Sequence, residues 1–223
     1  NTLANAFNYS NGVVFLPPPM RLPMTNERGY DLATLFDFDG DGDLDAYLGR
    51  RSQSCDSDGN DQLWVNSNGS FSVLATFPGD AARTTVASLP MDIEGNGTRD
   101  LFVLADDSYN QRASVYRNAP LGSFTRFDQP ALSFVPCCTG PQVRGGAVGD
   151  LNTDGFPDVF VASSGVDWMY MNQRDGGFVG TRTGLPTPSG AGINDDSRDV
   201  CVGDYDRDGD DDVFEIGRAS CRE

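Results

Sequence analysis

The sequence predicts an all-β fold, a β-propeller of four-stranded blades, from three observations. An acidic, glycine-containing segment of nine residues occurs four times, starting at Asp37, Asp92, Asp150 and Asp204, so the intervals are 55, 58 and 54 residues. Short apolar runs flank every copy and are typical of strands, whereas no stretch shows the sustained 3.6-residue periodicity of an amphipathic helix. A four-stranded unit repeated at a period near 50 residues is typical of a propeller blade.

Each repeat unit supplies four expected strands. In the second unit the run TTVASLPM precedes the acidic segment and the run RDLFVLA follows it. A third strand then ends in Asn, and a glycine-containing turn leads to a Phe that opens the fourth strand. The aligned pairs are Asn66 with Phe71, Asn118 with Phe124, and Asn172 with Phe178. We therefore expect about four blades in residues 1–214, joined by exposed Pro- and Gly-rich connections.

The acidic segments have the composition of calcium-binding loops, and they are called loops 1 to 4 below (residues 37–45, 92–100, 150–158 and 204–212). Every loop has an acid at positions one and nine, Asp, Glu or Asn at positions three and five, and Gly at position six. Oxygen ligands at alternate positions of a tight loop suit a hard cation such as Ca²⁺. The expected metal-site residues occupy positions one, three, five, seven and nine, with position seven offering its backbone carbonyl. They are Asp37, Asp39, Asp41, Asp43 and Asp45; Asp92, Glu94, Asn96, Thr98 and Asp100; Asp150, Asn152, Asp154, Phe156 and Asp158; and Asp204, Asp206, Asp208, Asp210 and Asp212.

Alternatives to a short calcium loop fit these segments less well. An EF-hand requires Glu at position twelve and flanking helices, whereas loops 1 to 3 have an apolar residue there and strand-like flanks. Zn²⁺ is disfavoured because the chain contains no His, and Mg²⁺ because it demands a tighter octahedral shell. Solvated acidic turns are the remaining alternative, since Asp and Gly are common turn residues. Among the four loops, loop 2 is expected to bind most weakly because Glu94 and Asn96 leave it three charges, one on a longer side chain.

The charge balance excludes several classes of partner. The chain has 223 residues and a formal net charge of -17, which argues against nucleic acid and anionic membrane surfaces. No apolar run reaches the roughly 18 to 20 residues that would span a membrane. The four loops hold 17 of the 33 acidic residues. Four bound Ca²⁺ ions would therefore bring the formal charge from -17 to -9 and act mainly as structural ions.

The last nine residues can be read as sequence that does not belong to the protein. Residues 215–223, EIGRASCRE, can be encoded by GAG ATC GGA AGA GCG TCG TGT AGG GAA, which matches the start of a widely used sequencing adapter. We therefore interpret residues 215–223 as adapter read-through. Residues 1–214 then form a partial repeat domain that is open at both ends.

Cysteine usage and glycosylation triplets fit an oxidising compartment. Four cysteines precede residue 215, an even number that allows three disulfide connectivities, with ordinary thiols as the alternative. Three N-x-S/T triplets are compatible with a secreted glycoprotein. The cysteines are Cys55, Cys137, Cys138 and Cys201, and the triplets begin at Asn8, Asn68 and Asn96. Asn96 is expected to serve as a calcium ligand rather than to carry a glycan.

The repeats resemble a known family. GDLNTDGFPDVFVAS and GDYDRDGDDDVF, each with a nearby N…G.F pattern, are similar to FG-GAP/VCBS repeats, which occur in integrin α-subunit propellers and in cartilage acidic protein-like (ASPIC-UnbV) proteins. The stretch GGFVGTRTGLP…SRDVCVGDYDRDGDDD is most similar to the latter group. The resemblance covers residues 28–214, and it implies a seven-bladed propeller of which this chain would form about half.

These features predict a calcium-stabilised extracellular β-propeller, secreted or on the cell surface, that acts in cell adhesion or matrix recognition. Its partner would be a protein or carbohydrate bound on a propeller face or rim, without nucleic acid and without direct membrane insertion. Two alternatives are an accessory or catalytic propeller of a secreted lyase or hydrolase, and a structural luminal propeller. We expect the chain itself not to be an enzyme, since without His it cannot form a Ser-His-Asp site.

Overall fold

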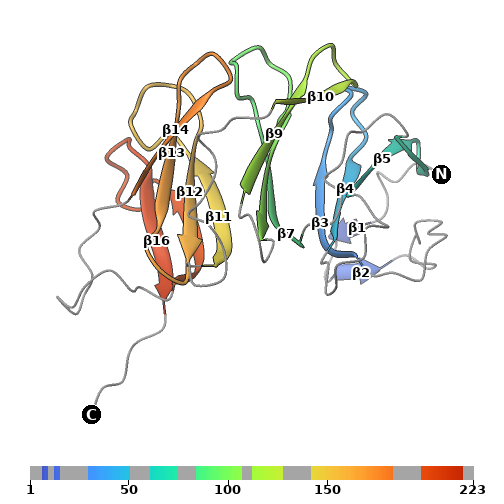
Figure 1. The fold of residues 1–223 in the computed structure, drawn as a ribbon. Helices are drawn as coiled ribbons and strands as arrows, with labels where there is room; N and C mark the ends of the chain where they lie inside the picture. Colours follow the sequence, from blue (N-terminus) through green and yellow to red (C-terminus); the bar gives the residue numbers. More distant parts are fainter. Residues whose placement is uncertain are drawn as a thin grey trace.

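The computed structural model describes residues 7–9, 13–15, 30–50, 61–74, 84–106, 112–127, 142–182 and 197–217. Every regular element in these ranges is a β-strand, and they contain no helix. The strands form three four-stranded antiparallel sheets and two two-stranded hairpins, and the sheets stand side by side (Figure 1). The expected all-β fold is therefore confirmed. The described part of the chain has no helix long and apolar enough to cross a membrane.

The strands follow the repeat. Blade 1 consists of β3 (Tyr30–Phe36), β4 (Asp45–Arg50), β5 (Gln62–Ser67) and β6 (Ser70–Val73). Blade 2 consists of β7 (Thr84–Met91), β8 (Asp100–Asp106), β9 (Arg112–Asn118) and β10 (Phe124–Phe127). Blade 3 consists of β11 (Val143–Gly149), β12 (Asp158–Ser163), β13 (Trp168–Asn172) and β14 (Phe178–Arg182). Two hairpins remain: β15 (Ser197–Gly203) with β16 (Asp212–Gly217), and β1 (Phe7–Tyr9) with β2 (Val13–Phe15).

The three sheets are consecutive blades of a β-propeller. Strand order within each sheet follows the sequence, so every blade is a simple meander. The first strands are neighbours in space: β3 lies beside β7, β7 beside β11, and β11 beside β15. The β15–β16 hairpin repeats the first two strands of a blade. The described residues therefore contain three complete blades and this half-blade hairpin, where about four blades were expected.

Two details show how regular the repeat is. The aligned residues of the third and fourth strands pair as expected, with Asn66 opposite Phe71, Asn118 opposite Phe124, and Asn172 opposite Phe178. The first strand of every unit also carries a register shift at the same place, seven to five residues before its loop. These shifts fall between Tyr30 and Leu32, Thr85 and Ala87, Val143 and Gly145, and Ser197 and Asp199.

The apolar core lies between the blades. Phe38 and Tyr47 of blade 1 belong to one buried cluster with Tyr116 and Phe124 of blade 2. A second cluster joins blades 2 and 3 in the same way. All six side chains of β12 are buried, because its sheet is covered on both faces. This sandwiching explains why the second strands show apolar runs instead of alternation, and each large side chain buried there stabilises the fold by about 1.5–3 kcal/mol.

The last hairpin shows how packing by a following blade buries the aromatic residue of the second strand. Position eleven of each repeat is Tyr47, Phe102, Phe160 or Phe214; the first three are 0% exposed, whereas Phe214 is 67% exposed. The equivalent aromatic side chain is thus buried only where a following blade packs against it. Glu215 continues β16, and its interpretation as adapter sequence stays a prediction. Cys201 is exposed on β15, and the other three predicted native cysteines lie outside the described residues.

Two buried carboxylates also join adjacent blades. Asp61, directly before β5, accepts hydrogen bonds from the Tyr47 hydroxyl at 2.6 Å and from the Thr85 hydroxyl of blade 2 at 2.7 Å. Asp167, directly before β13, accepts one from the Ser197 hydroxyl of the last hairpin at 2.9 Å. A buried carboxylate is costly unless it is hydrogen-bonded. These contacts therefore hold blade 1 against blade 2 and blade 3 against the last hairpin.

Candidate metal centres

The four acidic loops occupy equivalent places, each between the first and second strands of its unit. Position six is in the left-handed region in every loop, with φ from 85° to 99° at Gly42, Gly97, Gly155 and Gly209. A Cβ at any of these glycines would meet nothing within 4 Å, so the requirement for Gly is one of backbone conformation alone. The sequence prediction of a glycine-dependent turn is consistent with this geometry.

Position four is left-handed as well, which the sequence pattern did not reveal. Gly40 and Gly95 occupy it in loops 1 and 2, but Thr153 and Arg207 adopt φ of 56° and 66° in loops 3 and 4. A β-branched residue with positive φ is a conformational outlier. Its presence shows that loop geometry, rather than local preference, sets the backbone at this position.

The first acid holds each loop in its turn. Asp37 accepts hydrogen bonds from Gly40 N at 2.8 Å and Gly42 N at 3.0 Å, one on each carboxylate oxygen. Asp92 accepts the same bond from position six, Gly97 N at 2.7 Å, but its other bond comes from position five, Asn96 N at 2.9 Å. Loops 3 and 4 repeat this arrangement through Asp150 and Asp204. The chain thus closes the loop by itself, and each oxygen keeps a second lone pair for a cation.

The ninth acid lies inside the protein in the three complete blades. Asp45, Asp100 and Asp158 are each 0% exposed. Asp45 accepts hydrogen bonds from Phe38 N at 3.0 Å and from Asn66 N at 2.8 Å. Burial raises its pKa to about 6, although these two hydrogen bonds oppose the shift, and the charges of Asp39 and Asp41 raise the pKa further. Position nine therefore has a structural role that the sequence did not reveal, besides being a predicted ligand.

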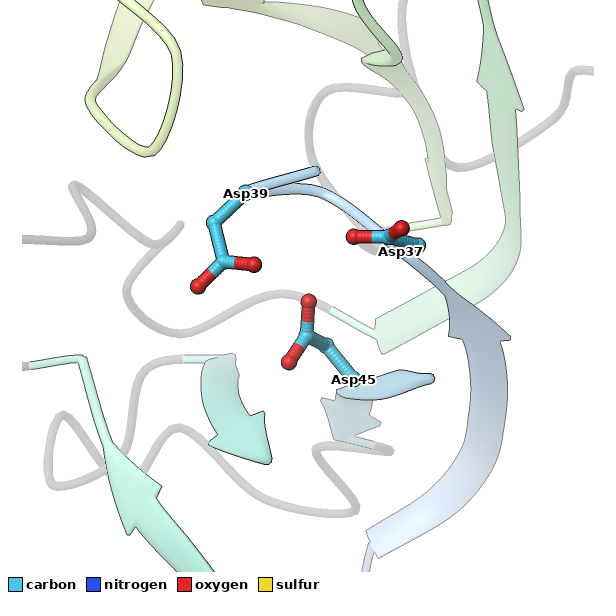
Figure 2. Close-up of side chains that lie close together, drawn as sticks. All are labelled: Asp37, Asp39 and Asp45. Carbon is cyan, nitrogen blue, oxygen red and sulfur yellow. The ribbon is translucent and has the colours of Figure 1, made fainter. Parts of the chain in front are cut away.

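Loop 1 brings three carboxylates together. One oxygen from each of Asp37, Asp39 and Asp45 lies within 4.8 Å of the other two. Figure 2 shows these carboxylates directed toward a common point, with Asp37 and Asp39 coming from the loop and Asp45 from the start of β4. Asp41 accepts a hydrogen bond from Asp43 N at 2.8 Å, and Asp43 accepts one from Asn68 N at 2.6 Å. The Asp43 carboxylate is thus held by the β5–β6 turn, and the expectation that only its carbonyl would be a ligand stays a prediction.

Loop 4 forms the other three-acid cluster in the part of the chain that the structure describes. One carboxylate oxygen from each of Asp204, Asp206 and Asp208 lies within 4.8 Å of the others, and all three residues are exposed. A hydrogen bond between Asp208 and Asp210 lowers the pKa of the first and raises that of the second. The fifth predicted ligand, Asp212, accepts a hydrogen bond from Tyr205 N at 2.9 Å, as position nine does in the other loops.

Part of the negative charge of loop 2 is balanced by an arginine of the same blade. Arg117 of β9 places its Nε 3.1 Å from Glu94 Oε1, and its guanidinium lies 4.0 Å from the centre of the Phe127 ring. Asn96 donates to the other Glu94 oxygen at 3.2 Å and accepts a hydrogen bond from Thr98 N at 2.8 Å. The arginine therefore competes with a cation for Glu94, which supports the expectation that this loop binds most weakly.

Loop 3 has an arginine of its own. Arg174, in the β13–β14 turn, lies 3.3 Å from Asp154 Oδ2. Although desolvation acts in the opposite direction, a hydrogen bond from Phe156 N and the nearby Arg174 charge lower the pKa of Asp154. Asn152 accepts a hydrogen bond from Asp154 N at 3.0 Å. Among the described residues, ion pairs thus reach loops 2 and 3 and do not reach loops 1 and 4.

The donor set fits a hard cation. The side chains at the predicted positions offer only oxygen atoms as metal ligands, and the clusters in loops 1 and 4 contain neither sulfur nor nitrogen ligands. Calcium takes six to eight oxygen ligands in flexible geometry, so carboxylates and backbone carbonyls on one short loop are suitable. The residues present therefore fit Ca²⁺.

Several residues around the loops were not predicted to contribute to the sites. The aligned Asn66, Asn118 and Asn172 were recognised as strand ends, but their contacts with the ninth acids were not foreseen. The ion pairs of Arg117 and Arg174 could not be predicted from local sequence, because their acidic partners lie 23 and 20 residues earlier in the chain. The recurrence of Asn at one place in each repeat was the observation that could have revealed its role.

Comparison with protein families identifies the repeat. The model of the FG-GAP-like repeat matches three overlapping segments, residues 37–103, 92–161 and 150–215. Each match begins at the first acid of a loop, and together they span residues 37–215, more than half of the chain. A comparison with curated proteins gave no match, and the narrower similarity to cartilage acidic protein-like proteins stays a prediction. The chain belongs to the FG-GAP-like repeat family.

Proposed function

We propose that this chain is a calcium-stabilised β-propeller module that binds a protein or carbohydrate ligand outside the cell, in adhesion or matrix recognition. FG-GAP-like repeats indicate a propeller-type binding module, and such repeats often bind Ca²⁺. The observation that carries the calcium part is the convergence of three carboxylates in loop 1 and again in loop 4. Both clusters contain the acids at positions one and three, and the third acid is at position nine in loop 1 and at position five in loop 4. The described arginines form an ion pair with neither cluster.

The electrostatic argument for a cation is simple. Two unit charges about 4 Å apart repel by about 4 kcal/mol at an effective dielectric constant of about 20. Oxygens of Asp37, Asp39 and Asp45 lie within 4.8 Å of one another, and Asp45 is withdrawn from water. A bound Ca²⁺ ion supplies positive charge that converts this repulsion into attraction. An ion that binds the folded state alone stabilises it by linkage.

Calcium availability favours an extracellular location. Extracellular calcium modules have dissociation constants of about 10⁻⁴ to 10⁻³ M, so sites of this kind fill outside cells and stay largely empty in cytosol. FG-GAP-like repeats also occur in extracellular proteins. We therefore place the module in a secreted protein or on the outer side of a cell surface.

The ligand is expected on a face or rim of the propeller. Rigid blades with connecting loops at both ends are a common scaffold for binding residues. The net charge of -17 disfavours nucleic acid. A protein or a carbohydrate fits this surface better, and calcium would act by holding the loops in shape rather than by contacting the ligand.

Thermal unfolding tests the calcium proposal. At a calcium concentration of about ten times the Kd, one site stabilises the fold by about 1.4 kcal/mol, which raises the Tm of a domain of this size by about 3–6 °C. The chain should show at least this rise in calcium relative to a chelator, and a smaller rise in the same concentration of Mg²⁺. An unchanged Tm in millimolar Ca²⁺ would contradict the proposal.

A further inference from the structure

The ninth acids of loops 1 to 3 are joined by a buried chain of hydrogen bonds that crosses from blade to blade. In loop 1, Phe38 N donates to Asp45, and the carbonyl of the same residue accepts a hydrogen bond from Asn118 Nδ2 at 2.6 Å. Asn118 belongs to blade 2, and its own N donates to Asp100 at 2.8 Å. The backbone of one residue, Phe38, and one asparagine therefore link the ninth acid of loop 1 with that of loop 2.

The same pattern leads from loop 2 to loop 3. Ile93 N donates to Asp100 at 3.0 Å, and Ile93 O accepts a hydrogen bond from Asn172 Nδ2 at 2.8 Å. Asn172 N then donates to Asp158 at 2.8 Å. Phe38, Ile93, Asn118, Asn172 and the ninth acids are all buried. Because water does not compete at these positions, the bonds are stronger than exposed ones and costly to leave unmade.

The two residues whose backbones carry these hydrogen bonds lie inside the predicted ligand loops. Phe38 stands between the predicted ligands Asp37 and Asp39, and Ile93 stands between Asp92 and Glu94. An ion held by the flanking side chains would fix the orientation of the intervening carbonyl. That carbonyl is the acceptor for the asparagine of the next blade. A loop ordered by an ion therefore fixes the asparagine of the next blade, and this asparagine positions the ninth acid of the next loop.

Packing reinforces the same contacts. Asn118 also accepts a hydrogen bond from Gly122 N at 2.7 Å, which holds the β9–β10 turn. This turn lies against loop 1, since a Cβ at Gly122 would be 3.7 Å from Asp39 Cβ. Between loops 2 and 3, a Cβ at Gly95 would be 3.0 Å from the Phe156 ring. Movement of one loop therefore disturbs the neighbouring blade.

We propose that Asn118 and Asn172 are positioning residues that couple the calcium loops, so that an ion in one loop raises the calcium affinity of the next. This inference rests on the proposed calcium function. Binding in the first loop orders residues that the second loop would otherwise have to order itself, and the affinity of the second loop rises accordingly. Coupling between sites is commonly about fivefold or more in affinity, and it acts equally in both directions.

Asn66 provides a matched control for the coupling residues. It makes the same bonds inside its own blade, donating from Nδ2 to Leu44 O at 3.0 Å and from N to Asp45 at 2.8 Å, and accepting from Gly69 N at 2.9 Å. Within the described part of the chain, its amide makes no hydrogen bond to another blade. Asn66→Ala therefore removes the bonds inside a blade, whereas Asn118→Ala also removes the link to loop 1.

Hydrogen exchange of the full chain, followed by mass spectrometry across a calcium titration, tests the coupling. The readout is the calcium concentration that half-protects the amides of residues 92–100. Disabling loop 1 with Asp37→Asn and Asp39→Asn, which keep a side-chain oxygen in place, should raise this concentration about fivefold or more. In an Asn118→Ala background the same change should have no effect, and in an Asn66→Ala background the rise should remain.

The outcomes separate this inference from the calcium proposal. A rise that persists with Asn118→Ala, or calcium protection of loop 1 without any effect on loop 2, would overturn the coupling alone. If no loop gains protection in calcium, the calcium function itself falls, and the coupling falls with it. Should Asn118→Ala fail to fold, the step through Asn172 is tested by disabling loop 3 with Asp150→Asn. The coupling predicts a weaker calcium response of loop 2 when Asn172 is intact, and no change in an Asn172→Ala background. A loop 2 response that Asp150→Asn leaves unchanged with Asn172 intact would overturn the coupling.

Discussion

Loops 1 and 4 differ from loops 2 and 3 in how their negative charge is balanced. Loops 1 and 4 each gather three carboxylates within 4.8 Å, and the described arginines do not reach them. In loops 2 and 3, Glu94 and Asp154 form ion pairs with Arg117 and Arg174. The left-handed backbone at positions four and six and the hydrogen bond from the position-six amide to the first acid are the same in all four loops. The repeat thus keeps its framework and varies its charge.

The difference teaches that a single repeat motif supports two means of neutralisation. An arginine supplied by the same blade offsets part of the charge permanently, whatever the calcium concentration. A loop without such an arginine depends on an external ion. Calcium sensitivity should therefore be concentrated in loops 1 and 4, although all four loops match the same sequence pattern.

The largest expected effect concerns the framework that both pairs of loops share. Asp100→Ala leaves the buried N–H groups of Ile93 and Asn118 without an acceptor, at about 1–3 kcal/mol each, so the free energy of unfolding should fall by about 2–6 kcal/mol. Asp212→Ala should cost less, because Asp212 is more exposed and accepts its one described bond from the exposed Tyr205. Urea unfolding in chelator measures both changes.

Asp100→Asn serves as the control for that comparison, because it removes the charge but keeps an acceptor oxygen. Its loss of stability in chelator should be clearly smaller than that of Asp100→Ala. Equal losses for Asp100→Ala and Asp212→Ala would show that the ninth acid has no special structural role in the complete blades.

The next effect separates the two kinds of loop directly. Asp37→Ala with Asp39→Ala should remove the contribution of loop 1 to the calcium-induced rise in Tm, about 3–6 °C for a site near saturation. Asp92→Ala with Glu94→Ala should remove less, since Arg117 already balances Glu94. Differential scanning calorimetry with and without calcium measures both shifts, and an equal loss in the two double variants would refute the ranking.

A smaller effect is expected from removing an internal cation. Arg117→Ala should lower stability in chelator by about 1 kcal/mol or less, because the ion pair with Glu94 is partly exposed. The same variant should increase the calcium-induced rise in Tm, since Glu94 then has no competing charge. Arg117→Lys keeps a positive charge and should show a weaker change. A calcium response that stays the same in Arg117→Ala would mean that the arginine does not tune the loop.

The smallest effect concerns position four of the loops. Thr153→Gly should stabilise the chain by up to about 1 kcal/mol, because a left-handed conformation costs a non-glycine residue about 1–2 kcal/mol and glycine's greater unfolded-state freedom offsets part of the gain. Gly42→Ala, which places a side chain in the same backbone region, should destabilise. Chemical denaturation measures both, and a loss of stability in Thr153→Gly would show that the threonine makes a compensating contact.

Much of the fold could be predicted from the sequence, because the repeat is written in residue types with strong local preferences. The glycines at position six mark the left-handed turns, and the Asn–Phe pairs mark the last hairpin of each blade. The contacts between blades could not be predicted. Asn118 reaches Phe38, 80 residues earlier, and only the packing of one blade against the next determines where its amide points.

The candidate sites were predicted in composition but not in detail. Alternating acids at positions one, three and five indicated oxygen ligands, and loop 1 brings three of its five predicted residues together. The sequence pattern alone could not show that Asp45 is buried, because its burial depends on how β4 packs within blade 1 and against blade 2. Nor could it show that Glu94 turns toward Arg117, a residue from a strand whose position only the folded sheet defines.

Direct measurement of calcium bound by the full chain tests the central claim. Equilibrium dialysis at millimolar calcium should give saturable binding of at least two ions per chain, corresponding to the clusters in loops 1 and 4. The Asp37→Asn, Asp39→Asn variant should bind one ion fewer. Absence of saturable binding, or unchanged stoichiometry in this variant, would contradict the assignment of loop 1 as a calcium site.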